Sequence, residues 1–111
     1  MRNINIAVAS TTSLPGQLER NLSQIKSMAE KAAADKADIM LTPELSASGF
    51  GFYPEVLETA EIAGQGPVYE ALADISEQNN LVLLVGFVEK NGDILHIAHY
   101  IVFPDRSFKV Q

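Results

Sequence analysis

An almost wholly apolar run, Leu81 to Val88, constrains the fold of this chain more than any other feature. Gly86 is its only member without an aliphatic or aromatic side chain. Such a run is typical of a strand that is covered on both faces of a sheet. Asn91-Gly92 then gives a strong hairpin signal and leads into a second apolar segment, Ile94 to Phe103. We therefore expect a sheet that has these two segments as neighbouring strands.

Two amphipathic helices are expected before this hairpin. The first has apolar residues at spacings of three and four, namely Leu18, Leu22, Ile25, Ala29 and Ala32,. The loop before it offers Ser13 as an N-cap and Pro15 in the first turn. The second helix should begin at Gly66-Pro67, an N-cap followed by a first helical position. Asn79-Asn80 can end it in a left-handed turn.

Shorter segments complete an alternating pattern. Ile4 to Ala9 and Ala37 to Leu41 read as strands, and Ser107 to Gln111 reads as the opening of another,. A short helical turn is expected over Pro54 to Ala60. Strands that alternate with helices in this way predict an α/β fold with right-handed crossovers. Because no helix follows the last strand, the 111 residues resemble an incomplete domain.

Composition excludes several classes of protein. The formal charge of −6 leaves no basic stripe that could neutralise phosphates, so no nucleic-acid partner is expected,. No stretch approaches the roughly 20 apolar residues of a membrane helix, and the first residues are too short an apolar run for a signal peptide. We therefore expect a cytoplasmic protein that has no membrane partner.

The sequence offers no metal or cofactor site. It has no Cys, which excludes disulfides and thiolate ligands within these residues,. His96 and His99 fall on opposite faces of a strand and lack a third ligand. Glycine-rich nucleotide and phosphate loops are absent,. Ser46 and Ser48 lack the preceding glycine of a nucleophile elbow, which argues against a serine hydrolase.

Glu44 is the best candidate for chemistry. It follows the predicted strand Ala37 to Leu41 and precedes an aromatic loop, Gly49 to Pro54. Open α/β sheets bind ligands at the carboxyl ends of their strands, and a carboxylate there suits a general base. Spacing alone leaves two interpretations open, a general base or a surface Glu in a turn. The aromatic residues of the loop, Phe50, Phe52 and Tyr53, could likewise wall a substrate pocket or pin the loop to the core.

The segment around Glu44 resembles the first catalytic block of the nitrilase, or carbon–nitrogen hydrolase, superfamily. The resemblance lies in Pro43-Glu44-Leu45 followed by Ser48-Gly49-Phe50, after an apolar strand that Ala37-Asp38 precedes. Further segments resemble the opening strand, the first helix with its recurrent Asn, the third strand and the next turn of that family. They are Ile4–Ala9, Leu18–Leu22, Val85–Glu89 and Phe103–Asp105.

The resemblance implies an α-β-β-α sandwich of the nitrilase type that assembles into homo-oligomers. It also implies hydrolysis of a non-peptide carbon–nitrogen bond in a small-molecule amide, carbamoyl compound or nitrile. The family's catalytic set is Glu, Lys and Cys. Glu44 matches the Glu, the general base that activates first the Cys and then the hydrolytic water.

The departures from the family pattern are equally informative. No Cys is present, and Lys109 lies inside the last predicted strand without the Arg and His neighbours of the family's Lys, so it reads as an ordinary strand lysine. Ile97 and Arg106 stand where the family usually has Asn and Gly. Residues 1–111 are therefore expected to be the N-terminal portion of a single carbon–nitrogen hydrolase domain, truncated before the catalytic Lys and Cys and inactive alone.

A second interpretation stays open, in which the chain is a non-catalytic α/β binding or assembly module on the same scaffold. The missing Cys is equally expected on that view. Either way, half of a sandwich should expose an apolar sheet face and an unpaired edge, both of which favour self-association.

Overall fold

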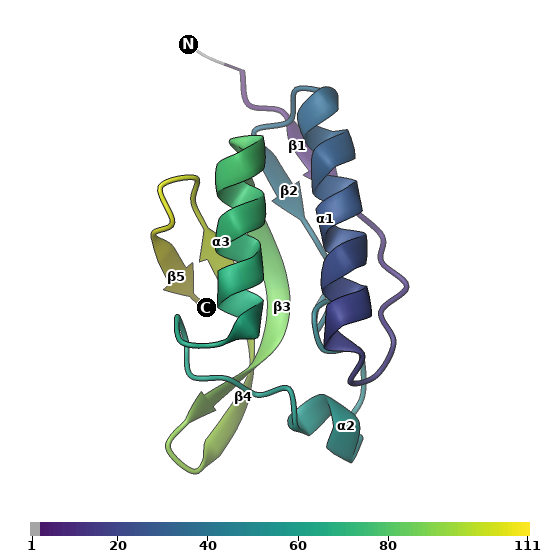
Figure 1. Cartoon of the computed structure of the whole chain (residues 1–111), viewed down its shortest axis with the longest axis vertical. Helices are drawn as coiled ribbons and strands as arrows, with labels where there is room; N and C mark the ends of the chain where they lie inside the picture. The colour runs from purple at the N-terminus through teal and green to yellow at the C-terminus, as the bar shows by residue number, and fades with distance from the viewer. Residues whose placement is uncertain (1–2) are drawn as a thin grey trace.

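A five-stranded mixed sheet forms the centre of the computed structural model, which describes residues 3–111 (Figure 1). The elements are β1 (Ile6–Val8), α1 (Leu18–Ala34), β2 (Ile39–Leu41), α2 (Pro54–Leu57), α3 (Pro67–Asn79), β3 (Val82–Asn91), β4 (Ile94–Val102) and β5 (Phe108–Val110). The strands lie side by side in chain order. β1, β2 and β3 are parallel, while β4 and β5 continue the sheet antiparallel. The α/β pattern predicted from the sequence is confirmed.

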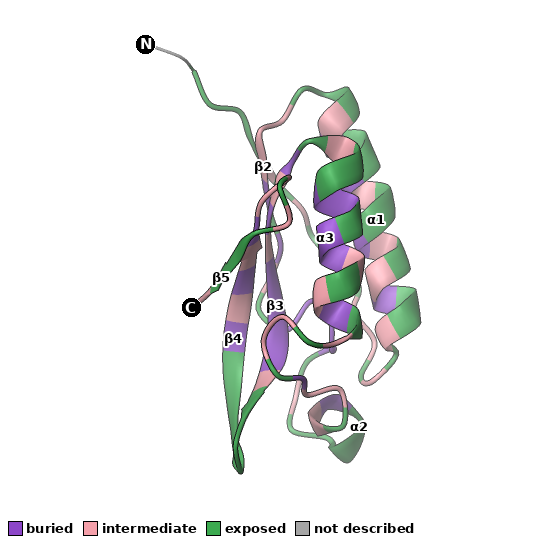
Figure 2. Ribbon diagram, turned by 60° about the vertical axis from the view of Figure 1, so that its left-hand side comes forward, coloured by how far each residue is buried: buried purple, intermediate pink, exposed green. Residues whose placement is uncertain are grey.

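The core lies between the sheet and the two long helices. α1 and α3 lie on the same side of the sheet (Figure 2). Alternate residues of β3 point towards them, and Leu83, Val85 and Phe87 are fully buried there. Ile25 of α1 and Leu72 of α3 meet these side chains in one cluster. Because each buried side chain of this size contributes about 1.5–3 kcal/mol, this layer supplies most of the hydrophobic stabilisation.

The predicted ends of α3 are confirmed. Gly66 is its N-cap, Pro67 is its first residue, and Asn80 ends it with a φ of +49°. The start of α1 differs from the prediction, because the helix begins at Leu18 and Ser13 is not its N-cap. Gly16, with a φ of +72°, turns the chain before the helix can start.

The predicted hairpin is also confirmed. β3 and β4 pair from Leu83↔Val102 to Asn91↔Ile94, so a two-residue loop joins them. Gly92 occupies its first position with a φ of +63°, a left-handed conformation that glycine adopts without steric cost,.

The turn between β4 and β5 explains the departure from the family pattern at Arg106. Arg106 has a φ of +72°, a conformation that favours glycine,. Its guanidinium contacts carboxylates of α3, at 2.8 Å from Asp74, 3.3 Å from Glu77 and 3.5 Å from Glu70. The hydrogen bond to Asp74 is the main cause that raises the pKa of Arg106. These ion pairs hold an arginine in a turn where glycine would be less strained.

The other face of the sheet is open over β1 and β2. Ile6 is 61% and Val8 is 78% exposed, and Leu41 and Ile97 are exposed as well. The prediction that the Leu81–Val88 run is covered on both faces is therefore wrong for its first half. Leu84 alternates with the buried side chains of β3 and is only half-buried, because neither α1 nor α3 reaches its side of the sheet. The expected exposed apolar face is confirmed.

This open face leads to a prediction about self-association. Water contact with contiguous apolar surface is unfavourable, so we expect the chain to associate through the face that carries Val8 and Ile97. Replacing both residues by Lys should shift the chain to monomer in sedimentation-velocity experiments. It should lower the apparent free energy of unfolding only by the contribution of association and keep the transition cooperative, because neither side chain belongs to the buried core of the chain,.

The matched control places the same two charges on the outer surfaces of the helices, at the exposed residues Ser23 and Gln78. This variant should associate as the original chain does. A monomeric original chain with a cooperative thermal transition would contradict the expectation.

Candidate active site

Glu44 lies in a tight turn just beyond the carboxyl end of β2. The amide of Ser46 donates to the carbonyl oxygen of Pro43 at 3.2 Å, and the amide of Gly49 donates to that of Leu45 at 2.8 Å. The Glu44 side chain is exposed and has no hydrogen-bond or ion-pair partner within residues 3–111. The structure therefore places an unpaired carboxylate at the end of a parallel strand, where α/β sheets bind ligands.

Leu45 gives the turn its unusual backbone. Its φ is +54°, in the left-handed region that costs a non-glycine residue about 1–2 kcal/mol,. Its side chain is nevertheless buried, in a small cluster with Val56 and Val88. This burial holds Leu45 in the strained conformation, which determines where the preceding Glu44 lies.

Gly86 of β3 allows the turn to approach the sheet. A Cβ atom at this position would collide with the backbone nitrogen of Leu45 and would lie 2.9 Å from the carbonyl carbon of Glu44. The carbonyl oxygen of Gly86 also accepts a hydrogen bond from the amide of Ala47, at 3.0 Å. A strand glycine that permits close backbone approach is a recognised pattern. The interruption of the apolar run at Gly86 was the sequence signal for this contact.

Asn21 fastens the segment after Glu44 to α1. It is fully buried, and its side-chain nitrogen donates to the carbonyl oxygens of Leu14 and Ala47, both at 2.9 Å. Its side-chain oxygen accepts from the amide of Leu14 at 2.9 Å. Ser13, the wrongly predicted N-cap, instead donates to the carbonyl oxygen of Ser46 at 2.6 Å. These bonds leave the Glu44 turn little freedom to move.

The hydroxyl groups near Glu44 form hydrogen bonds within the protein. Thr42 and Ser46 share a hydrogen bond of 2.6 Å between their hydroxyl oxygens, and Thr42 also donates to the carbonyl oxygen of Leu84. Ser48 donates to the carbonyl oxygen of Gly49. Since all three residues are buried and hydrogen-bonded, none of them is placed as a nucleophile.

The aromatic side chains of the loop Gly49 to Pro54 do not pack into the core. Phe50, Phe52 and Tyr53 are 45%, 78% and 57% exposed. Phe52 instead lines a hollow of about 240 Å³ between this loop and the β3–β4 hairpin. We call it the apolar hollow. Its lining residues are Leu45, Gly51, Phe52, Val56, Leu57, Val88, Leu95, His96 and Ile97. Glu44 is not among them, but the next residue is.

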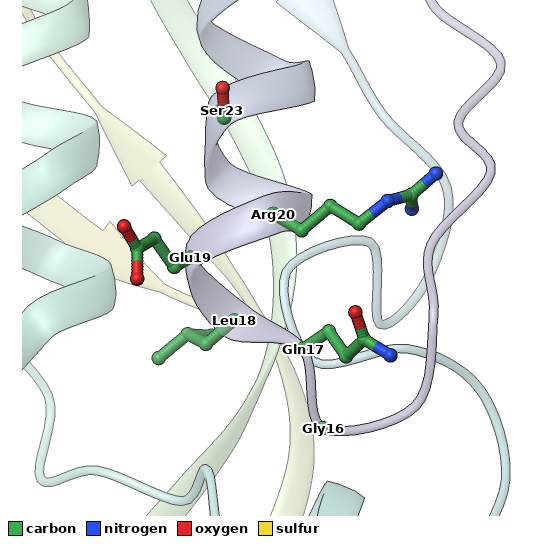
Figure 3. Close-up of a pocket in the computed structure, with 6 residues that line it drawn as sticks. All are labelled: Gly16, Gln17, Leu18, Glu19, Arg20 and Ser23. Atoms are coloured by element: carbon green, nitrogen blue, oxygen red, sulfur yellow. The ribbon is translucent and has the colours of Figure 1, made fainter.

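A larger depression lies elsewhere, beside the first turn of α1 (Figure 3). Figure 3 shows that Glu19 and Arg20 point away from each other, so their charges do not converge on one point. The Arg20 guanidinium donates to the carbonyl oxygen of Thr12 at 3.3 Å. This depression therefore has no arrangement of side chains that suits catalysis.

The remaining candidates are not gathered near Glu44. Lys109 is an exposed residue of β5, and two strands separate β5 from β2 in the sheet. At about 4.8 Å between neighbouring strands, this separation exceeds any direct contact. Residues 3–111, which include His96 and His99, contain no group of three His, Cys, Asp or Glu side chains that could hold a metal ion. No helix in that range is long and apolar enough to cross a membrane.

Glu61 is a buried carboxylate that the sequence did not reveal. It is 6% exposed and accepts hydrogen bonds from the amides of Val68 at 2.8 Å and Tyr69 at 3.0 Å. These are amides of the first turn of α3, which otherwise lack partners. The Tyr100 hydroxyl donates to the same carboxylate at 2.7 Å. Glu61 thus caps α3 and joins it to β4.

Tyr100 completes this network inside the core. Its ring stacks on Phe87 with the centroids 3.8 Å apart, and its hydroxyl oxygen accepts from the amide of Gly64 at 2.9 Å. Burial raises the pKa of the Tyr100 hydroxyl, and the hydrogen bond to Glu61 raises it further. The network ties the segment that follows α2 to the sheet.

Replacing Gly86 by Ala tests the close contact beneath Glu44. The added methyl group has no space beside the Leu45 backbone, so we expect a loss of about 1–3 kcal/mol in the free energy of unfolding,. Urea unfolding measures this loss, and the amide resonances of Leu45 and Ala47 should shift. The control is Gly92→Asn, where nothing lies within 4 Å and Asn tolerates a positive φ,. A Gly86→Ala variant as stable as this control would contradict the contact.

The Tyr100 network predicts a loss of stability at alkaline pH. The ordinary pKa of the hydroxyl is 10.0, and folding raises it. The unfolded chain therefore loses this proton first as the pH rises above about 10, and the free energy of unfolding then falls. Tyr100→Phe should flatten this fall in urea unfolding between pH 8 and pH 11. The control variant Tyr53→Phe, at an exposed tyrosine, should show the same decrease in the free energy of unfolding with pH as the original chain. An equal dependence on pH in the two variants would refute the prediction.

Comparisons with known proteins agree with this architecture. The carbon–nitrogen hydrolase family model matches residues 5–111. A nitrilase of Pyrococcus abyssi is 27% identical over 88 residues, which cover 78% of this chain and 34% of the relative. The chain therefore spans about a third of the length of that relative.

Solved structures share the fold. The chain superposes on an N-terminal amidase crystallised with an Asn-Glu-Ala peptide, with a TM-score of 0.83, 22% identity, and coverage of 97% of this chain and 27% of the amidase. A carbon–nitrogen hydrolase superfamily protein from Xanthomonas campestris gives a TM-score of 0.86 at 16% identity, with coverage of 99% and 40%. The expected nitrilase-type fold is thus confirmed, and with a family match over nearly its whole length the chain belongs to the carbon–nitrogen hydrolase family.

Proposed function

We propose that the protein to which this chain belongs hydrolyses a non-peptide carbon–nitrogen bond, and that Glu44 is its general base. Family membership supports carbon–nitrogen hydrolysis in general. The observation that supports Glu44 as the base is its unpaired carboxylate, which is carried by a turn at the end of β2. A general base needs a free lone pair, which the unpaired carboxylate has, and the hydrogen-bonded turn fixes the backbone that carries it,.

The proposed mechanism uses Glu44 together with a Cys and a Lys that lie outside residues 1–111. Glu44 accepts the proton of a Cys thiol while the sulfur attacks the carbon of the amide or nitrile. Glu44 then gives this proton to the nitrogen, which leaves as ammonia or an amine, and the acyl group stays on the sulfur. The deprotonated Glu44 next accepts a proton from a water molecule, whose oxygen attacks the acyl carbon, so that the carbon–sulfur bond breaks and the acid is released. A Lys stabilises the negative charge of the tetrahedral intermediate. Residues 1–111 contain no Cys, so we propose that they are the N-terminal portion of one catalytic domain and inactive alone.

The substrate in this proposal is a small-molecule amide, carbamoyl compound or nitrile. The names of the similar proteins, a nitrilase and an N-terminal amidase, support nitriles and amides within this range. Assembly into homo-oligomers is proposed as well, and the exposed apolar sheet face supports it. A cytoplasmic location stays a prediction from the sequence.

A second candidate is a non-catalytic binding or assembly module. The absence of Cys from the sequence is expected on this view as well, and the exposed Glu44 does not line the apolar hollow. The coding sequence downstream of Gln111 separates the two candidates. The catalytic proposal requires a Lys within a few residues and a Cys further on, whereas a module needs neither.

Glu44→Gln tests the catalytic proposal in the longest protein that the gene encodes. Gln keeps the shape of Glu but cannot accept a proton, so we expect kcat on small amides and nitriles to fall by about 10²–10⁴-fold. Ammonia release measures turnover. The 111-residue chain assayed alone should release none.

The matched control is Glu58→Gln, since Glu58 is an exposed glutamate on the segment that follows α2. It should retain full activity. Turnover by the 111 residues alone, or full activity in the Glu44→Gln protein, would refute the proposal.

A further inference from the structure

We propose that Thr42 and Ser46 are positioning residues for Glu44, because the hydrogen bond between their hydroxyl groups closes the turn across Glu44 and ties it to β3. We call these two groups the hydroxyl pair. The inference rests on the proposed function and deepens it by assigning a role in that function to two residues that do not touch the substrate. Three observations support it: the place of the pair in the turn, the direction of its hydrogen bonds, and its burial.

The hydroxyl pair joins the two ends of the turn that carries Glu44. Thr42 comes before Glu44 and Ser46 comes after it, each separated from it by a single residue. Their hydroxyl oxygens are 2.6 Å apart, a short and well-formed hydrogen bond,. The backbone bond across the same turn, from the amide of Ser46 to the carbonyl oxygen of Pro43, is 3.2 Å long. The side chains therefore close the turn more tightly than this backbone bond does.

The donor in each of these hydrogen bonds can be assigned. The Thr42 hydroxyl donates to the carbonyl oxygen of Leu84 at 3.0 Å. Because a hydroxyl group has a single hydrogen, Thr42 accepts in its bond with Ser46, and Ser46 donates,. The amide of Thr42 donates to the same Leu84 oxygen, also at 3.0 Å. A continuous path of hydrogen bonds thus runs from Ser46 through Thr42 to the central strand β3.

Burial makes the pair hard to replace. Thr42 is 5% exposed and Ser46 is fully buried, so water does not readily take the place of a lost partner,. The Ser13 hydroxyl also donates to the carbonyl oxygen of Ser46 at 2.6 Å, which anchors Ser46 through its backbone as well. The exposed Glu44 therefore lies between two anchored residues. Since a misplacement of about 1 Å can cost about 10²-fold in rate, these anchors bear on the work of a general base.

The assigned directions predict that the two partners are unequal. Thr42→Val keeps the shape of Thr but removes the acceptor of Ser46, which leaves a buried hydroxyl without a partner,. Ser46→Ala leaves the bond from Thr42 to Leu84 intact. Thr42→Val should therefore lower the urea midpoint of unfolding more than Ser46→Ala does. The double variant has no orphaned hydroxyl, so it should regain part of the stability that Thr42→Val loses.

The test measures kcat and KM on small amides and nitriles in the longest protein that the gene encodes. Thr42→Val should lower kcat by about 10- to 100-fold and leave KM unchanged, because the substrate still binds but its base is less well placed. The double variant Thr42→Val, Ser46→Ala should stay as slow although it regains stability. Thr42→Ser, which keeps the hydroxyl, should restore most of kcat. A purely structural role would instead make kcat follow stability in all of these variants.

The matched control is Ser76→Ala. Ser76 is fully buried, and its hydroxyl donates to the carbonyl oxygen of Leu81 at 2.6 Å. Leu81 precedes β3 and Glu44 follows β2, so the two lie at opposite ends of these parallel strands. Ser76→Ala should lose stability as the other hydroxyl variants do, but its kcat should equal that of the original protein.

Amide hydrogen exchange in the 111-residue chain gives a measurement that needs no activity. The amide of Ser46 bonds the carbonyl oxygen of Pro43, and the amide of Ala47 bonds that of Gly86. Thr42→Val should speed exchange at these two amides by about tenfold relative to the amides of β3, because the turn opens locally once the pair is lost. Ser76→Ala should leave this ratio unchanged.

Three outcomes would overturn the inference alone. The first is unchanged exchange at Ser46 and Ala47 in Thr42→Val. The second is full kcat in Thr42→Val while Glu44→Gln is inactive, a result that leaves the proposed function standing. The third is a double variant that regains kcat together with stability. Full activity in Glu44→Gln would instead refute the proposed function, and the positioning role with it, because there is then no base to position.

Discussion

The contact between Gly86 and the backbone of Glu44 and Leu45 is the constraint on which the candidate site depends. The missing side chain at Gly86 lets a loop rest directly on a central strand. Leu45 can then bury its side chain beside Val88 although its backbone is left-handed. The position of the Glu44 backbone and one wall of the apolar hollow both follow from this contact. A methyl group at residue 86 would disturb all of them together.

Two buried polar side chains secure the loops around this contact. Asn21 ties the segment after Glu44 to α1, and Glu61 ties the segment after α2 to α3 and β4. Within residues 3–111, every buried side-chain nitrogen and oxygen has a hydrogen-bond partner. An unsatisfied buried group costs about 1–3 kcal/mol, so such complete pairing favours one arrangement of the loops over its alternatives. The catalytic proposal needs this rigidity, because a general base must keep its position through the reaction.

Sequence patterns predicted the regular elements well, because their signals are local. The Gly66-Pro67 start and Asn80 end of α3, and the hairpin at Gly92, were read correctly from turn chemistry. Local rules failed where a distant residue intervened. Ser13 had the chemistry of an N-cap but instead bonds the carbonyl oxygen of Ser46, 33 residues away. Arg106 occupies a position that suits glycine because carboxylates of α3 hold its side chain.

By itself, the sequence determined the order of strands and helices, the family, and the placement of Glu44 at the end of a strand, since periodicity and motif spacing carry that information. Only the tertiary structure decided that Gly86 supports the Glu44 turn, that Glu61 caps α3, and that Phe52 borders a hollow instead of joining the core. These features depend on distances between residues that lie far apart in the chain. Only folding brings these distant residues into contact, and local sequence patterns do not show which of them will meet.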